Sequence, residues 1–120
     1  MTNDNEFITF LLELLEPMGP VEAKRMFGGF GIYRHGLMFG LVSQDTFYLK
    51  ADDVNRTEFE ERGLPSFTYE RRGKVLSMSY YQAPPEAMDH SEELCKWAKE
   101  AYDAALRAAR KKPKKKRSKN

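Results

Sequence analysis

The charged residues of this 120-residue chain fall into two blocks, and that division limits what the chain can fold into. Residues 107–120 hold nine Lys or Arg and no Asp or Glu, whereas residues 1–106 hold eleven basic and eighteen acidic residues, a net charge of −7. A block of like charges repels itself and buries nothing, so it usually stays disordered as an interaction tail. We therefore expect an acidic globular domain over residues 1–108 and a basic, disordered tail over residues 109–120.

The composition of the chain excludes several classes of protein. The single Cys95 excludes an intramolecular disulfide and a cysteine-based zinc cluster, and two histidines leave little for a metal site. No segment approaches the run of about eighteen apolar residues that a membrane span needs, and the N-terminus lacks the pattern of a secretory signal. We therefore expect a protein that contacts no membrane and holds no metal or cofactor.

Hydrophobic periodicity and breaker residues predict three helices. The first has apolar residues at spacings of three and four, and the last has a stripe of alanines around Trp97. We expect the first helix to start near Asn3 and to stop at Pro17. A short second helix should run from Asp52 or Asp53 to Arg62, with Gly63 just after its end. A long third helix should cover residues 90–112 and end near Pro113.

Runs of aromatic and branched residues predict five strands, over residues 30–34, 37–42, 46–50, 67–70 and 74–81. His35-Gly36, Ser43-Gln44-Asp45 and Arg71-Arg72-Gly73 separate neighbouring runs, as expected for hairpin turns. The order is helix, three strands, helix, two strands, helix. This order favours a two-layer α+β fold in which the helices pack on an antiparallel sheet.

The candidate catalytic residues all have a simpler structural interpretation. Gly28, Gly29 and Gly31 are spaced like a phosphate-binding loop, but such loops open a helix, and these glycines lead into a strand. We interpret them as a bulge or a close approach of two backbones. His35 and His90 fall on a hairpin tip and in a capping context, and Cys95 is expected to pack as a small apolar side chain. We predict no catalytic residue and no enzyme.

Ten aromatic residues fall on the predicted strands, more than a small core requires. One interpretation is a stacking platform for single-stranded nucleic acid, which needs exposed rings among basic residues. The other is a core on one face of the sheet and a protein-binding or dimerisation surface on the opposite face. The net charge of −7 favours the second. The ten residues are Phe27, Phe30, Tyr33, Phe39, Phe47, Tyr48, Phe67, Tyr69, Tyr80 and Tyr81.

The basic tail supplies the candidate nucleic-acid-binding residues. Its cations can neutralise phosphates and release counterions, which is the sequence-independent part of nucleic-acid affinity. A solubilising end without a specific partner, or docking onto the acidic body, remains an equal alternative. The candidate residues are Arg107, Arg110, Lys111, Lys112, Lys114, Lys115, Lys116, Arg117 and Lys119.

From residue 25 onward the chain resembles the TfoX N-terminal domain family. The residues that carry the resemblance are Arg25, Met26, Phe27, Gly28, Gly29, Gly31, Gly36, Lys50, Gly63, Phe67, Tyr69, Tyr80, Tyr81, Pro84 and Trp97. The resemblance covers about residues 7–108 and implies a two-layer α/β fold in a bacterial, cytoplasmic protein linked to competence genes for DNA uptake. It implies no catalytic residue. Longer members carry a second, helical domain, whereas here KKPKKKRSKN follows, so we expect a stand-alone domain.

Together these observations predict a non-enzymatic regulatory domain. Its body would bind a protein partner, as a monomer or a homodimer, and its tail would give non-specific affinity for DNA or RNA. The alternative is a transcription regulator whose body contacts DNA directly, through basic residues near strand ends such as Arg25, Arg71 and Arg72. A small enzyme or ligand-binding protein that uses the glycine segment is the third class.

Overall fold

The computed structural model describes residues 3–26 and 28–117 and confirms the α+β class. Within this part of the chain, one antiparallel sheet has the strand order β1-β2-β3-β4-β6-β5. The strands are β1 (Glu22–Met26), β2 (Gly29–Arg34), β3 (Leu37–Ser43), β4 (Thr46–Lys50), β5 (Ser66–Arg71) and β6 (Lys74–Gln82). The helices are α1 (Asn3–Leu14), α2 (Arg56–Glu61) and α3 (Ser91–Arg117), with short 3₁₀ turns η1 (Glu16–Met18) and η2 (Pro85–Asp89).

Three hairpins close at the positions that the sequence predicts. All three turns have two residues, although three were expected at residues 43–45 and 71–73. Both central residues of each turn have positive φ, which matches the right-handed twist of the strands on either side. The turn residues are His35 (φ 50°) and Gly36 (79°), Gln44 (51°) and Asp45 (58°), and Arg72 (52°) and Gly73 (77°). These turns fix the register of β2 on β3, of β3 on β4 and of β5 on β6.

The structure differs from the prediction at two elements. Strand β1 was not expected, because its sequence EAKRM is mostly polar and exposed. It forms because all five of its residues pair with β2 at the edge of the sheet. The last helix was expected to end near Pro113 but continues to Arg117. Proline removes one backbone hydrogen bond, and a helix that is already nucleated can continue past that loss.

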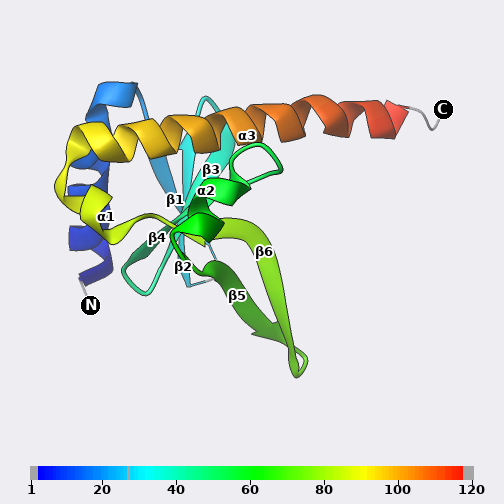
Figure 1. Ribbon diagram of the computed structural model, residues 1–120, viewed down its shortest axis with the longest axis horizontal. Coiled ribbons are helices and arrows are strands. Elements are labelled where there is room, and N and C mark those ends of the chain that lie inside the picture. Colours follow the sequence, from blue (N-terminus) through cyan, green and yellow to red (C-terminus); the bar gives the residue numbers. More distant parts are fainter. Residues whose placement is uncertain (1–2, 27, 118–120) are drawn as a thin grey trace.

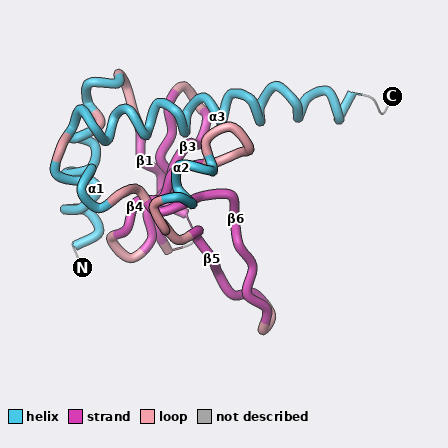
Figure 2. The backbone as a smooth tube through the Cα atoms, in the orientation of Figure 1, coloured by secondary structure: helices cyan, strands magenta, loops and turns pink. Residues whose placement is uncertain are grey.

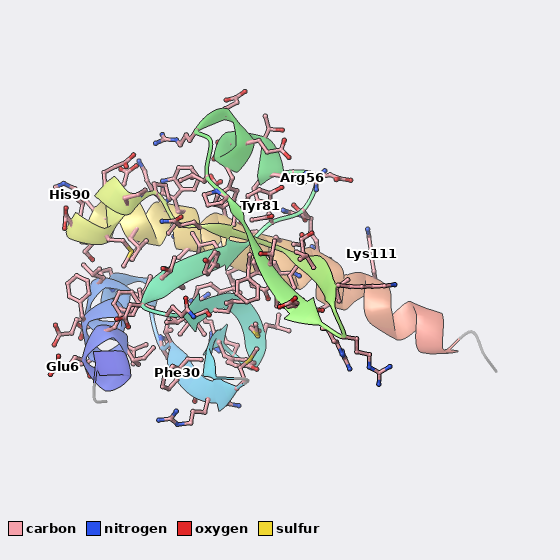
Figure 3. The ribbon with its side chains drawn as sticks, turned by 90° about the horizontal axis from the view of Figure 1, so that it is seen from below. Glu6, Phe30, Arg56, Tyr81, His90 and Lys111 are labelled. Atoms are coloured by element: carbon pink, nitrogen blue, oxygen red, sulfur yellow. The ribbon has the colours of Figure 1, made fainter. Side chains whose placement is uncertain are left out.

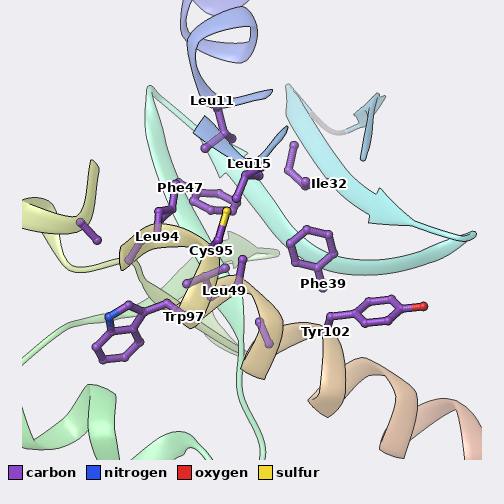
Figure 4. Packing of buried hydrophobic residues seen from close by; sticks show 14 of the residues in the cluster. Leu11, Leu15, Ile32, Phe39, Phe47, Leu49, Leu94, Cys95, Trp97 and Tyr102 are labelled. Atoms are coloured by element: carbon purple, nitrogen blue, oxygen red, sulfur yellow. The ribbon is translucent and has the colours of Figure 1, made fainter. Parts of the chain in front are cut away.

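The core lies between the sheet and the helices. Leu11 and Leu15 from α1 and its end, and Leu94 from α3, are completely buried against Phe39 and Leu49 of the sheet (Figure 4). The predicted stripe on α3 is confirmed, since Leu94, Trp97, Ala98, Ala101 and Ala105 are all buried. Each fully buried leucine contributes roughly 1.5–3 kcal/mol. The helices therefore cover one face of the sheet and hold it in place.

Two elements extend away from this core (Figures 1 and 2). Strand β6 pairs with β4 only from Tyr48↔Gln82 to Lys50↔Tyr80, and its remaining register is with β5 alone. The far part of the β5–β6 hairpin is thus a two-stranded ribbon. The C-terminal part of α3 likewise runs past the sheet. No helix in the described residues is both long and apolar enough to cross a membrane.

Candidate functional site

One face of the sheet carries no helix, and Figure 3 views the molecule from that side, with α3 behind the strands. Side chains that are opposite in register share a face, and successive residues of a strand alternate between faces. Leu49 and Val42 belong to the core, so Leu41, Tyr48, Lys50 and Tyr80 project to the other side. We call this side the outer face. Its residues are Glu22, Lys24, Met26, Tyr33, Met38, Leu41, Tyr48, Lys50, Phe67, Tyr69, Arg71, Lys74, Leu76, Met78 and Tyr80.

The glycines of β2 allow the outer face to pack closely. A Cβ atom on Gly31 would lie 2.9 Å from the Tyr33 ring, 3.0 Å from the Met26 sulfur and 3.1 Å from the Met38 sulfur. A Cβ atom on Gly29 would lie 2.1 Å from the backbone oxygen of Val42. The expected close backbone approach is therefore confirmed. The glycines open a strand instead of a helix, so the geometry of a phosphate-binding loop is absent from them.

A row of aromatic rings continues from β4 onto the hairpin. The rings of Tyr48 and Phe67 meet edge to face with centroids 5.0 Å apart, and Phe67 stacks with Tyr69 at 6.2 Å. Tyr69 is 38% exposed, and Tyr48 and Phe67 are half-buried. The row is thus ordered by its own contacts and still open to solvent.

Lysines lie over two further rings of the outer face. The Nζ of Lys24 is 4.9 Å from the centroid of Tyr33, and the Nζ of Lys50 is 5.2 Å from that of Tyr80. Tyr80 is itself buried, and this burial, together with the nearby Tyr33, raises its pKa to about 12. Tyr80 is therefore neutral at physiological pH, and Lys50 lies over an uncharged ring.

A pocket of about 660 Å³ opens between the β1–β3 end of the sheet and the hairpin. This volume is in the range of about 300–1,000 Å³ that is usual for ligand pockets. Its apolar lining comes from Met26, Leu41, Phe67, Tyr69 and Met78, and Glu70 and Arg71 line it as well. The pocket joins strands that are far apart in the sequence.

The described basic residues near the C-terminal end of α3 are of two kinds. One makes hydrogen bonds within the folded domain, and the others are exposed. Arg107 donates from Nε to Oδ2 of Asp52 at 2.6 Å and from Nη2 to Oδ1 at 2.9 Å. These bonds hold the pKa of Asp52 at about 2, well below its usual value. Arg110 and Lys111 are exposed, and with Arg107 and Lys50 they line an open groove of about 600 Å³.

The remaining predicted tail residues lie outside what the structure describes in detail. Helix α3 includes positions 112 and 114–117, but their side chains are outside the described residues, as is the whole of Lys119. The expected nucleic-acid contacts of this segment therefore stay a prediction.

The charges of the body are separated by element. All eighteen acidic residues lie in the described part of the chain, and thirteen of them belong to helices or 3₁₀ turns. The six strands carry six Lys or Arg and only two Glu. The net charge of −7 for residues 1–106 thus describes the helical side, and the sheet is positively charged.

The histidines and the cysteine do not form a catalytic group. His35 is in its hairpin turn and meets the Tyr102 ring at 6.5 Å, and His90 follows η2. Cys95 is buried and donates to the carbonyl of Leu14 at 3.4 Å. Burial raises the pKa of this thiol, whereas a nucleophile needs a lowered one. In the described residues, no group of three or more potential ligands can hold a metal ion.

A comparison with protein families agrees with this fold. The profile of the TfoX N-terminal domain matches residues 13–105, most of the chain. The chain belongs to the TfoX N-terminal domain family. It is 24% identical over 95 residues to Protein Sxy of Escherichia coli K12, a match that covers 79% of this chain and 46% of Sxy. It is 26% identical over 78 residues to DNA transformation protein TfoX1 of Aliivibrio fischeri, covering 65% of this chain and 35% of that protein.

This TfoX N-terminal domain thus spans less than half the length of both relatives. The residues that carried the resemblance lie on the helical side, in turns and on the outer face. Trp97 and Tyr81 pack on Phe59 on the helical side, with centroids 5.1 and 5.3 Å apart. Gly36 and Gly63 have positive φ in turns. The outer face takes Met26, Gly29, Gly31, Lys50, Phe67, Tyr69 and Tyr80, while Gly28 is in the β1–β2 turn, Pro84 is buried and Phe27 lies outside the described residues.

The three cations proposed for direct DNA contact do not form one site. Arg71 lines the pocket, and Arg72 is in the hairpin turn. Arg25 pairs in register with Phe30 and lies over that ring at 5.1 Å, on the opposite face of the sheet. Sequence reasoning from the alternation of side chains along a strand is enough to put Leu76, Met78 and Tyr80 on one face. It missed Met26 and Leu41 as their neighbours, because only the strand order brings them together.

Proposed function

We propose that this domain is a non-enzymatic regulatory module that binds nucleic acid through the basic end of α3 and a protein partner through its body. The observation that supports it best is the continuation of α3 past the sheet (Figure 1). The nine basic residues that follow position 106 start on this extension, and no acidic residue accompanies them. A helix that leaves the body can approach phosphates without bringing the acidic helical side close to them.

The part of the proposal that concerns a protein partner rests on the β5–β6 hairpin. Its side chains Val75 and Leu76 are 72% and 37% exposed. A two-stranded ribbon is marginally stable by itself, so exposed apolar side chains on it suit a surface that another protein covers. The name of one relative, DNA transformation protein TfoX1, supports a role in DNA transformation as the setting for both interactions.

The nucleic-acid part is tested by titrating the full chain with a mixed-sequence DNA duplex over a series of salt concentrations. The variant is Lys115→Gln with Lys116→Gln, and the matched control is Lys96→Gln with Lys99→Gln on the part of α3 that packs on the body. The slope of log affinity against log salt should fall by about 1.8 in the variant, because each phosphate contact contributes about 0.9. Equal slopes for the variant and the control would contradict the proposal.

The protein-partner part is tested by placing a photo-reactive amino acid at position 75 in cells, with position 96 as the control site. A discrete cross-linked product from position 75 alone, identified by mass spectrometry, is the expected result. A product that contains only a second copy of this chain identifies a homodimer. The absence of any discrete product would remove the hairpin as the partner surface.

A further inference from the structure

We infer that the outer face binds single-stranded nucleic acid, with its exposed rings stacking on bases and its cations contacting phosphates. The inference rests on the nucleic-acid part of the proposed function but assigns a second site with a different ligand, unpaired strands. The site is formed by residues of all six described strands, and its central residues are Tyr48, Phe67, Tyr69, Arg71 and Met78.

The rings provide the first step of the argument. Tyr48, Phe67 and Tyr69 form a continuous row in which neighbouring centroids are 5.0 and 6.2 Å apart. Because every base has a π-face, a row of open rings can bind a single strand with little sequence preference. Tyr69 is the most exposed of the three and is the ring that a base can reach first.

The pocket provides the second step. The space of about 660 Å³ beside these rings is lined by apolar side chains such as Met26, Leu41 and Met78. A base that enters this pocket therefore leaves water. Gly29 is part of its lining, and a Cβ atom there would lie 2.1 Å from the backbone oxygen of Val42, so a larger residue does not fit at this position without a shift of the backbone. In a duplex the bases are stacked and paired inside the helix, so a recessed pocket of this kind suits an unstacked base.

The charges provide the third step and decide between nucleic acid and protein as the occupant. Lys24, Lys50, Arg71 and Lys74 belong to the outer face together with one carboxylate of the edge strand, Glu22, while most acidic residues of the body belong to helices on the opposite side. A phosphate backbone that follows the sheet therefore meets cations along its path. The carboxylate of Glu70 is at the hairpin end of the pocket, next to Arg71. Rings interleaved with cations fit a nucleic-acid strand better than a purely apolar partner surface.

The test measures binding of the full chain to fluorescein-labelled dT12 and to a labelled twelve-base-pair duplex. Tyr69→Ala removes the open ring, and Val75→Ala is the matched control, because Val75 is on the same hairpin, is more exposed and points away from the pocket. We expect Tyr69→Ala to weaken dT12 binding about fivefold or more, Tyr69→Phe to restore it, and Val75→Ala to leave it unchanged. Arg71→Gln should reduce the salt slope for dT12 by about 0.7.

Three outcomes would overturn the inference. The first is equal dT12 affinity for Tyr69→Ala and Val75→Ala. The second is an equal loss of duplex and dT12 affinity on Tyr69→Ala, which indicates recognition of the backbone alone. The third is a change in sedimenting mass on Tyr69→Ala, which makes the outer face a contact between two copies of the chain. The variant Lys115→Gln with Lys116→Gln separates the two sites, because it should lower duplex affinity and keep the dependence of dT12 binding on Tyr69.

Discussion

At the scale of single residues, the ion pair of Asp52 and Arg107 is a contact that the sequence alone does not indicate. Arg107 is the first of nine basic residues in the C-terminal block, and by composition it belongs with the tail. In the structure it closes a two-bonded contact with Asp52, fifty-five residues away. Nothing in the local pattern links these two positions. The partner of Arg107 follows only from how α3 crosses the end of β4.

This pair predicts a pH-dependent stability. The pKa of Asp52 falls to about 2 in the folded state, so the pair stabilises the fold above the unfolded value of about 4 and the gain is lost as pH falls from about 4 towards 2. Asp52→Asn should lower the free energy of unfolding at pH 7 by about 1 kcal/mol, because the pair is partly exposed and solvent screens it. Asn keeps the acceptor for the amide of Val54.

Urea denaturation at pH 7 and at several values below pH 4 measures this effect. The difference between Asp52→Asn and the wild type should shrink as the pH falls. The control is Asp53→Asn, whose carboxylate is 92% exposed beside Arg56 and should change stability much less. A difference that stays constant down to pH 2 would mean that the charge of Asp52 does not stabilise the fold.

At the scale of elements, what the sequence predicts depends on whether the signal is local. The hairpins were predictable, because residues such as His35-Gly36 and Arg72-Gly73 specify turns with positive φ by themselves. Strand β1 was not, because its polar sequence becomes a strand only through pairing with β2. The end of α3 was predicted wrongly for a related reason. Pro113 is a local signal for the end of a helix, whereas the helix around it is already formed over many preceding residues.

The β5–β6 hairpin predicts uneven protection from hydrogen exchange. From Lys74 to Met78, β6 pairs with β5 alone, and a two-stranded ribbon opens at a low free-energy cost. We expect the amides of residues 68–77 to exchange at least about tenfold faster than those of β2 and β3, which pair on both sides. Exchange measured by mass spectrometry or NMR gives this ratio. Equal protection of the ribbon and the central strands would mean that another part of the chain covers the hairpin.

The same measurement bears on the outer face. If dT12 binds there, it contacts both strands of the ribbon, through Tyr69 and Arg71 of β5 and Met78 of β6, and should slow exchange in residues 68–77. A duplex held by the end of α3 should leave the ribbon unchanged. Exchange thus locates each ligand on an element without any substitution.

At the scale of the whole molecule, the fold puts most acidic residues of the body on one side and most basic residues of the strands on the other. The sequence predicts an acidic body and a basic tail, and from this average we expected the body to repel phosphates. The fold instead puts thirteen of the eighteen acidic residues on helices and 3₁₀ turns, and gives the strands six cations against two Glu. Net charge is a property of composition, whereas a ligand meets one face. The strand order, which no local pattern contains, decides which face that is.

The boundary between body and basic end predicts the result of two truncations. A chain that ends at Leu106 loses the bonds of Arg107 to Asp52, whereas one that ends at Ala109 keeps them. The shorter chain should therefore unfold about 4 °C below the full chain, since a loss of about 1 kcal/mol has roughly this effect in a domain of this size. The chain ending at Ala109 should match the full chain within about 1 °C. Both truncations remove most of the nine basic residues that follow position 106, so duplex binding should weaken in both.

Thermal unfolding at low and high salt separates this expectation from its alternative. If the basic residues beyond position 109 docked on the acidic helices, removing them would lower the unfolding temperature at low salt and not at high salt, because salt screens such contacts. We expect no such dependence, because α3 runs away from the body at that point (Figure 1). Stability would then belong to residues up to about 109 and duplex affinity to those that follow. A salt-dependent loss on truncation at Ala109 would instead make the basic end part of the fold and leave fewer of its cations for phosphates.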